Sequence, residues 1–166
     1  PPPPPGPLPP PPQRPYSSPA YPRYALALLL AVFIVTFLDR QVVAILLQAI
    51  KRDLGLSDPQ LGAFSGIAFA ALYSTLGIPI ARWADRGVRR SIIALALLVW
   101  SGMTALQGLA SSFGWLFAAR IGVGIGEAGC SPPAHSMIAD LFPPRRRATA
   151  LSIYALGIPI GGAIGL

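Results

Sequence analysis

Long apolar segments are the feature of this sequence that most constrains its fold. A helix that crosses a bilayer needs about 20 consecutive, mostly apolar residues. Five segments of roughly this length follow one another along the chain: 24–50, 60–83, 91–110, 115–141 and 148–166. A set of five such segments with almost no polar face does not fit the core of a soluble domain. The sequence therefore predicts an all-α membrane protein.

The composition excludes a soluble globular enzyme. Hydrophobic residues make up 53% of the chain and charged residues only 11%, whereas a soluble domain carries about a quarter charged residues. The net charge of +7 would be compatible with nucleic-acid binding. However, the basic residues lie in short clusters between apolar segments, as they do in membrane proteins. We therefore expect a lipid bilayer as the partner, and no nucleic acid.

The chain has one cysteine, Cys130, and one histidine, His135. A single cysteine excludes a disulfide scaffold, and one residue of each type cannot form an ordinary metal site. We expect no metal and no cofactor. Cys130 is interpreted as a small packing residue. His135 follows Pro132 and Pro133, which disturb the helix, and we expect it to donate to a carbonyl that they free.

The first 23 residues form a region of their own. They hold 13 of the 20 prolines, and proline sustains neither a helix interior nor a sheet. Residues 1–23 are therefore predicted to be a disordered, proline-rich cytoplasmic tail, although the PxxP spacing is also compatible with an SH3-like partner. The region does not have the pattern of a signal peptide. Because the chain does not begin with Met, we expect a processed protein or a fragment.

Basic residues gather in two of the four connections between the apolar segments. The second-to-third and fourth-to-fifth connections carry Arg82, Arg86, Arg89, Arg90, Arg145, Arg146 and Arg147. The first-to-second connection balances basic against acidic residues, and residues 111–114 carry no charge. Because positive connections stay in the cytoplasm, we expect a multi-pass protein of the plasma or inner membrane with a cytoplasmic N-terminus.

Four ionisable residues lie inside apolar segments: Asp39, Arg40, Arg120 and Glu127. A charge near the middle of a bilayer costs about 2.5–3.5 kcal/mol on insertion scales, and such residues usually line a pathway. Arg120 and Glu127 are seven residues apart and thus share a helix face, where Asp39 of a facing helix is expected to lie between them. The alternatives are a proton-coupling and substrate cavity or a buried ion-pair network that only holds the helices together.

Small residues recur at helical spacing. Gly122, Gly124 and Gly126 are the main set in the fourth segment, and Gly62 and Gly66 lie in the second. Spacing of this kind lets helix backbones approach closely in lipid. We therefore expect a packed helix bundle.

Two motifs resemble the major facilitator superfamily. The second-to-third connection, Gly77-Ile-Pro-Ile-Ala-Arg-Trp-Ala-Asp85-Arg86-Gly87-Val-Arg89-Arg90, is similar to the signature loop G-x-x-x-G-x-x-x-D-R-x-G-R-R. The fourth segment contains Arg120-Ile-Gly122-Val-Gly124-Ile-Gly126, which resembles the Arg-plus-glycine pattern of that superfamily's fourth helix. The resemblance implies the N-terminal part, about four to five transmembrane helices, of a twelve-helix bundle with two six-helix halves.

A narrower resemblance is to spinster-type transporters, whose best-known members move lysolipids and sphingoid phosphates. It rests on Phe37-Leu38-Asp39-Arg40, on Gly122 to Ala128, and on Ile138-Ala139-Asp140-Leu141-Phe142. Organic-anion symporters of the same superfamily share much of the pattern in the fourth and fifth segments, including a Phe-Pro-x-x-Arg turn. Both remain candidates for the substrate class.

The resemblance implies a secondary active transporter that works by alternating access, coupled to protons, for a small organic or amphipathic solute. The loop of Gly77, Asp85, Arg86, Arg89 and Arg90 would form its cytoplasmic gate. Asp85 would accept hydrogen bonds from a helix N-terminus of the missing C-terminal half, and Arg89 and Arg90 would pair with carboxylates there or face anionic lipid. The alternatives from other classes are a membrane-embedded enzyme and a non-transporting scaffold.

Overall fold

The structure is a computed structural model that describes residues 20–67, 75, 79, 82–83 and 87–166. Its elements are α-helices, with one short π-helix and no strand among these residues: α1 (Ala20–Asp53), α2 (Asp58–Gly62), η1 (Ala63–Ile67, the π-helix), α4 (Arg89–Gly108), α5 (Phe113–Ala128), α6 (Ser131–Leu141), α7 (Pro144–Ala155) and α8 (Gly157–Ile164). The predicted all-α fold is confirmed.

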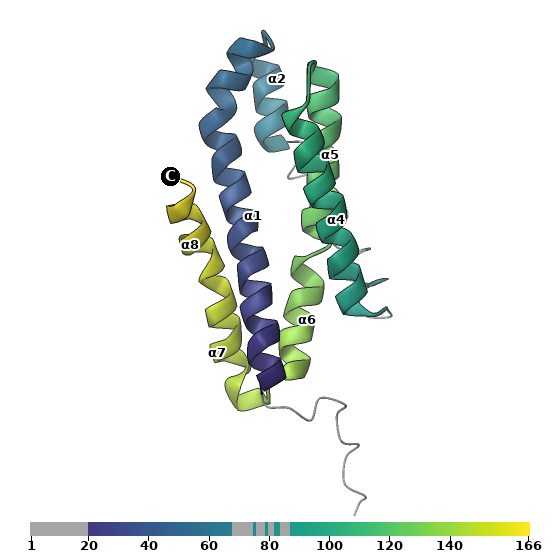
Figure 1. The fold of residues 1–166 in the computed structure, drawn as a ribbon, viewed down its shortest axis with the longest axis vertical. Helices are drawn as coiled ribbons and strands as arrows, with labels where there is room; N and C mark the ends of the chain where they lie inside the picture. Colours follow the sequence, from purple (N-terminus) through teal and green to yellow (C-terminus); the bar gives the residue numbers. More distant parts are fainter. Residues whose placement is uncertain (1–19, 68–74, 76–78, 80–81, 84–86) are drawn as a thin grey trace, which may run out of the picture.

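Helix α1 is the central element of the bundle (Figure 1). Helices α7 and α8 run along one side of it, and α4, α5 and α6 lie on the other side. We call the end at which the α1–α2 and α4–α5 connections lie the far end. The near end holds the start of α1 and the α6–α7 connection.

Three helical stretches are long and apolar enough to cross a membrane: α1, α4 and the continuous stretch α7–α8 over Pro144–Ile164. Helix α1 begins at Ala20, so Ala20–Arg23 belong to the helix and not to the predicted tail. Pro22 is compatible with this start, because the first turn of a helix has no carbonyl partner for the N–H that proline lacks. Residues 1–19 lie outside the described part of the chain.

The predicted segment 115–141 is divided into two helices. Helix α5 ends at Ala128 and α6 begins at Ser131. Pro132 and Pro133 stand in the first turn of α6, where they lack the N–H groups that would have bonded to the carbonyls of Ala128 and Gly129 at the end of α5. The helix therefore breaks immediately before the prolines.

Buried apolar side chains form two clusters. The near cluster joins α1, α4, α6 and α7 through Leu26, Leu29, Ile93, Ala134, Ile138, Ala150 and Tyr154. The far cluster joins α1, α2, η1 and α5 through Val43, Leu56, Leu61, Phe64 and Leu116. On α1, Leu29 belongs to the first cluster and Val43 to the second, so Asp39 and Arg40 lie between them.

Glycines hold α5 close to α4. A Cβ added to Gly126 would lie 2.7 Å from the backbone nitrogen of Trp100 and 2.8 Å from the carbonyl oxygen of Ala96, and one added to Gly122 would collide with Met103. Only glycine fits such an approach. Gly62 and Gly66 in α2 and η1, in contrast, have nothing within 4 Å of an added Cβ.

Candidate functional site

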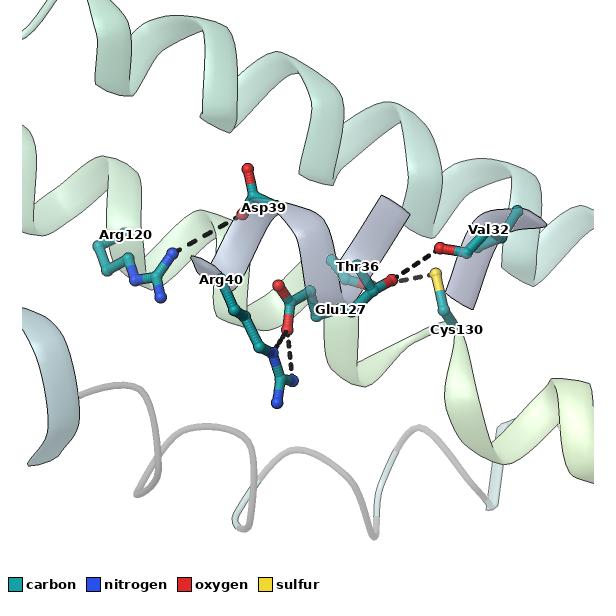
Figure 2. Close-up of polar contacts among 8 residues, drawn as sticks. Val32, Thr36, Asp39, Arg40, Arg120, Glu127 and Cys130 are labelled. Atoms are coloured by element: carbon teal, nitrogen blue, oxygen red, sulfur yellow. Dashed lines mark hydrogen bonds and ion pairs between the residues drawn. The ribbon is translucent and has the colours of Figure 1, made fainter. Parts of the chain in front are cut away.

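Arg40 of α1 and Glu127 of α5 form a two-point ion pair (Figure 2). Arg40 Nη2 donates to Glu127 Oε2 at 2.6 Å, and Arg40 Nε donates to the same oxygen at 3.0 Å. The Glu127 side chain has no exposed surface, whereas 33% of the Arg40 side chain is exposed. The buried carboxylate therefore depends on Arg40 for its main compensation of charge.

Asp39 and Arg120 form a second, looser pair in the same place. Arg120 Nη1 lies 3.9 Å from Asp39 Oδ2 (Figure 2), which is an ion pair without a hydrogen bond. The Arg120 side chain is 5% exposed and that of Asp39 15%. Arg120 also lies over the ring of Phe64, with its Cζ 5.7 Å from the ring centroid, a geometry in which the aromatic face attracts the cation.

The arrangement differs from the expectation that Asp39 lies between Arg120 and Glu127. Asp39 pairs with Arg120, and Arg40 takes Glu127. Arg120 and Glu127 do face α1 together, but they lie about 10 Å apart along the axis of α5. The short side chain of Asp39 cannot span that distance, and the longer one of Arg40 reaches the second position.

The four groups, which we call the charge network, balance two positive against two negative charges. Thr36 and Cys130 lie beside the charge network without joining it (Figure 2). The Thr36 hydroxyl donates to the Val32 carbonyl at 3.0 Å, and the Cys130 thiol lies 3.6 Å from the Gly126 carbonyl oxygen. Because each of them is satisfied within its own stretch of chain, neither adds a partner to the charge network in the described part of the chain.

The two arginines and the aspartate face different spaces. Arg40 and Arg120 line a cavity of about 280 Å³ together with Ser65 of η1. Asp39 instead lines two cavities on the α4 side of α1, of about 350 and 570 Å³. Ser65 was not predicted to line a cavity, and neither were Thr104 and Gln107, which lie on the α4 side of Asp39. The spacing of Thr104 and Gln107, two polar residues in an apolar segment, was the available signal.

The predicted gate loop is only partly described. Gly77, Asp85 and Arg86 lie outside the described residues. Arg89 stands at the first position of α4 and pairs with Asp140 of α6. Among the described residues its carboxylate partner is thus Asp140, and a pairing with carboxylates of the C-terminal half stays a prediction. The start of α4 and the end of α6 lie close enough together for the long side chain of Arg89 to reach Asp140.

His135 contributes no functional geometry. Its Nδ1 lies 2.9 Å from the Ser131 carbonyl oxygen, to which a ring N–H donates, and its ring meets Tyr154 edge-on with the centroids 5.1 Å apart. The contact is with a carbonyl, as expected, but the prolines free the carbonyls of Ala128 and Gly129, four residues before them, and not that of Ser131. Among the described residues, no group of three His, Cys, Asp or Glu side chains is placed to hold a metal ion.

Comparison with known proteins identifies the family. The model of the family "Major Facilitator Superfamily" matches residues 29–166. The chain belongs to the major facilitator superfamily. This match confirms the predicted superfamily, and it makes the chain part of an integral, multi-pass membrane protein.

Relatives of the chain are transporters and not enzymes. An MFS-type efflux pump of Mycolicibacterium smegmatis is 38% identical over 142 residues, which are 86% of this chain and 33% of the pump. A hexuronate transporter of Bacillus subtilis is 34% identical over 133 residues, 79% of this chain and 31% of that protein. The chain thus spans about a third of the length of these relatives.

A solved structure supports the spinster-type resemblance. The crystal structure of a bacterial homolog to the human lysosomal transporter spinster, inward-facing and unoccupied, is 47% identical to this chain. Its TM-score is 0.85, and the match covers 90% of this chain and 31% of that one. The predicted likeness to the spinster-type branch is therefore confirmed.

Proposed function

We propose that the complete protein is a proton-coupled secondary active transporter that works by alternating access on a small organic or amphipathic solute with an anionic group. The observation that carries the proposal is the buried, charge-balanced network of Asp39, Arg40, Arg120 and Glu127. Ionisable groups at membrane depth are retained where they serve transport. The present chain would supply one wall of the solute cavity, and the missing C-terminal half the other.

The charge balance explains why solute and proton would move together. Arg40 and Arg120 line one cavity with Ser65, and an anion entering it would compete with Asp39 and Glu127 for the two guanidinium groups. The competition would leave an unpaired carboxylate at low dielectric, which is costly. Uptake of one proton by that carboxylate removes the cost and keeps the whole site neutral.

The anionic solute class is also suggested by the names of relatives. The Bacillus protein is named a hexuronate transporter, and a Danio rerio relative, 29% identical over 135 residues, a sphingosine-1-phosphate transporter. A sugar acid and a phosphorylated sphingoid base share an anionic group and differ in their apolar part. The runner-up proposal is therefore an organic-anion symporter, favoured by the small cavity beside the two arginines.

The proposed orientation places the N-terminus in the cytoplasm of a cell with the protein in its plasma or inner membrane. Arg145, Arg146 and Arg147 follow α6 and lie at the near end, as does the Arg89–Asp140 pair. Positive connections stay in the cytoplasm, so the near end would be cytoplasmic and the far end would face outward.

The test is uptake by proteoliposomes that contain the full-length protein, with an imposed pH gradient. The solutes offered are a hexuronate, a galactonate and sphingosine-1-phosphate. Asp39→Asn is expected to abolish pH-driven uptake while the protein still inserts. The matched control is Asp58→Asn, because the Asp58 side chain is 84% exposed and pairs only with Lys51 among the described residues. Unchanged pH-driven uptake in Asp39→Asn would refute the proton-coupling role.

A second test separates a solute cavity from a purely structural ion-pair network. Cysteines placed at Arg120 and Glu127, in turn, are expected to react with small aqueous thiol reagents from one side of the membrane at a time. Complete protection in every conformation would contradict the cavity and favour the structural network.

A further inference from the structure

The seam between α1 and α4 contains polar atoms that an apolar bundle does not explain. Thr104 Oγ1 and Gln107 Oε1 are buried and have no hydrogen-bond partner within the described part of the chain. The two residues are three positions apart on α4, so their side chains lie on the same side of the helix. Buried polar groups are otherwise almost always hydrogen-bonded, and these two atoms therefore point to a polar occupant of the seam.

A cavity of about 350 Å³ runs along this seam. On α1 its lining begins at Asp39 and ends at Asp53, and Val43, Leu46 and Ile50 lie between them at intervals of three or four residues. This spacing makes one continuous face of the helix, about 21 Å long at 1.5 Å per residue. On α4 the cavity is lined by Thr104 and Gln107.

The cavity connects Asp39 with the far end of the bundle. Asp53 is the last residue of α1, and Gly108, the last residue of α4, also lines the cavity. Both lie at the end that holds the α1–α2 and α4–α5 connections (Figure 1). A second cavity continues from Asp39 toward the near end, where Val32, Val35 and Leu97 line it; Trp100, Ser101 and Thr104 also line this cavity. Thr104 thus borders both cavities beside Asp39, whereas Gln107 lines only the cavity that leads to the far end.

We propose that the α1–α4 seam is a hydrated proton route from the outer surface to Asp39, with Gln107 and Thr104 as its polar stations. The cavity has room for several water molecules. The Gln107 amide would orient water near the mouth at Asp53. The Thr104 hydroxyl would accept a hydrogen bond from one water and donate to the next, so that a proton enters at one end of the chain of hydrogen bonds and leaves at the other.

The route reaches Asp39 from the side away from the arginine-lined cavity. Asp39 is faced by Arg120 of α5 and lies beside Arg40, whose partner is Glu127. The route itself is lined by Thr104 and Gln107, and its charged residues are Asp39 and Asp53. Asp39 would thus exchange protons with the outside while the arginine-lined cavity is closed to that side. This inference rests on the proposed role of Asp39 in proton coupling and on the proposed orientation, in which the far end faces outward.

The first test removes the polar stations without changing their size. In the full-length protein, Thr104→Val combined with Gln107→Leu is expected to slow the initial rate of pH-driven uptake at least tenfold. Solute exchange without a pH gradient is expected to stay unchanged, because it needs no net proton movement. The matched control is Thr36→Val with Gln48→Leu, since the Thr36 hydroxyl is bonded within α1 and Gln48 does not line the cavity. A rate within twofold of this control would overturn the route.

The second test measures water access and does not depend on coupling. Single cysteines at Gln107 and at Thr104, with Cys130→Ala in the background, are expected to react with a small cationic thiol reagent added from outside, Gln107→Cys faster. A cysteine at Leu106, which does not line the cavity, is expected to stay unreactive. Protection of both route positions would overturn the proposal. If both route positions are labelled but Asp39→Asn keeps normal pH-driven uptake, only the coupling role of Asp39 is refuted.

Discussion

Removal of Arg40 is predicted to be the most damaging single change in the charge network. In Arg40→Met, the Glu127 carboxylate loses both of its donors, at 2.6 and 3.0 Å, and its side chain has no surface exposed to water. Breaking a buried ion pair by removing one partner costs about 3–5 kcal/mol, because the other charge is left uncompensated. We expect a loss of this size in the free energy of unfolding.

Removal of the acidic partner, Glu127, is predicted to lower the free energy of unfolding by less. Glu127→Gln leaves Arg40 without its carboxylate, but 33% of the Arg40 side chain is exposed and water can hydrate it. The remaining loss is that of hydrogen bonds to a charged group, about 1.5–3 kcal/mol. The two halves of one ion pair should therefore differ in their cost, with Arg40→Met the more damaging.

The assay is a double-variant cycle on the full-length protein in mixed micelles, with the free energy of unfolding measured for each member. The double variant Arg40→Met/Glu127→Gln removes both charges, so it should be more stable than Arg40→Met alone. The geometry described for the Arg40–Glu127 pair would be refuted if the losses in free energy of unfolding simply add in the double variant. Equal losses for the two single variants would refute it as well.

Three further predictions follow from other parts of the bundle. Gly126→Ala should lower the free energy of unfolding by about 1–3 kcal/mol, because the new methyl group meets the backbone of α4. The control Gly102→Ala has open space around it and should be neutral or stabilising. Equal melting temperatures for the two variants would contradict this prediction. Arg89→Ala should cost less than about 1 kcal/mol in the same unfolding measurement, because 60% of the side chain of its partner Asp140 is exposed; a larger loss would contradict a surface pair. Asp85→Asn should shift the full-length protein about tenfold toward the inward-open state, which distances between the cytoplasmic ends of the two halves would report; an unchanged distribution with normal transport would leave Asp85 an ordinary loop residue.

The membrane-spanning character of the chain could be predicted because it depends on simple quantities. Segment length, low charge and the position of the Arg clusters are properties of the sequence alone, and they predicted the all-α bundle. Helix boundaries were less predictable where capping decides them. Ser57 and Gln60 form a capping box at the start of α2, and the first-turn prolines place the break between α5 and α6.

The pairing within the charge network could not be predicted from spacing. The seven-residue interval correctly places Arg120 and Glu127 on a common face, but the choice of partner depends on side-chain reach between two helices. Asp39 and Arg40 are adjacent, and only the packing of α1 against α5 determines which of them meets which residue. The same limit applied to Arg89, whose partner Asp140 is 51 positions away in the sequence.

Proton uptake on solute binding is the decisive measurement of whether the charge network couples solute to protons. The full-length protein is placed in weakly buffered detergent solution with a pH indicator, and the solute found by the uptake assay is added. We expect the unmodified protein to take up about one proton per solute bound, and Asp39→Asn to take up none while it still binds solute. Solute binding without proton uptake, or equal uptake by Asp39→Asn, would contradict this coupling.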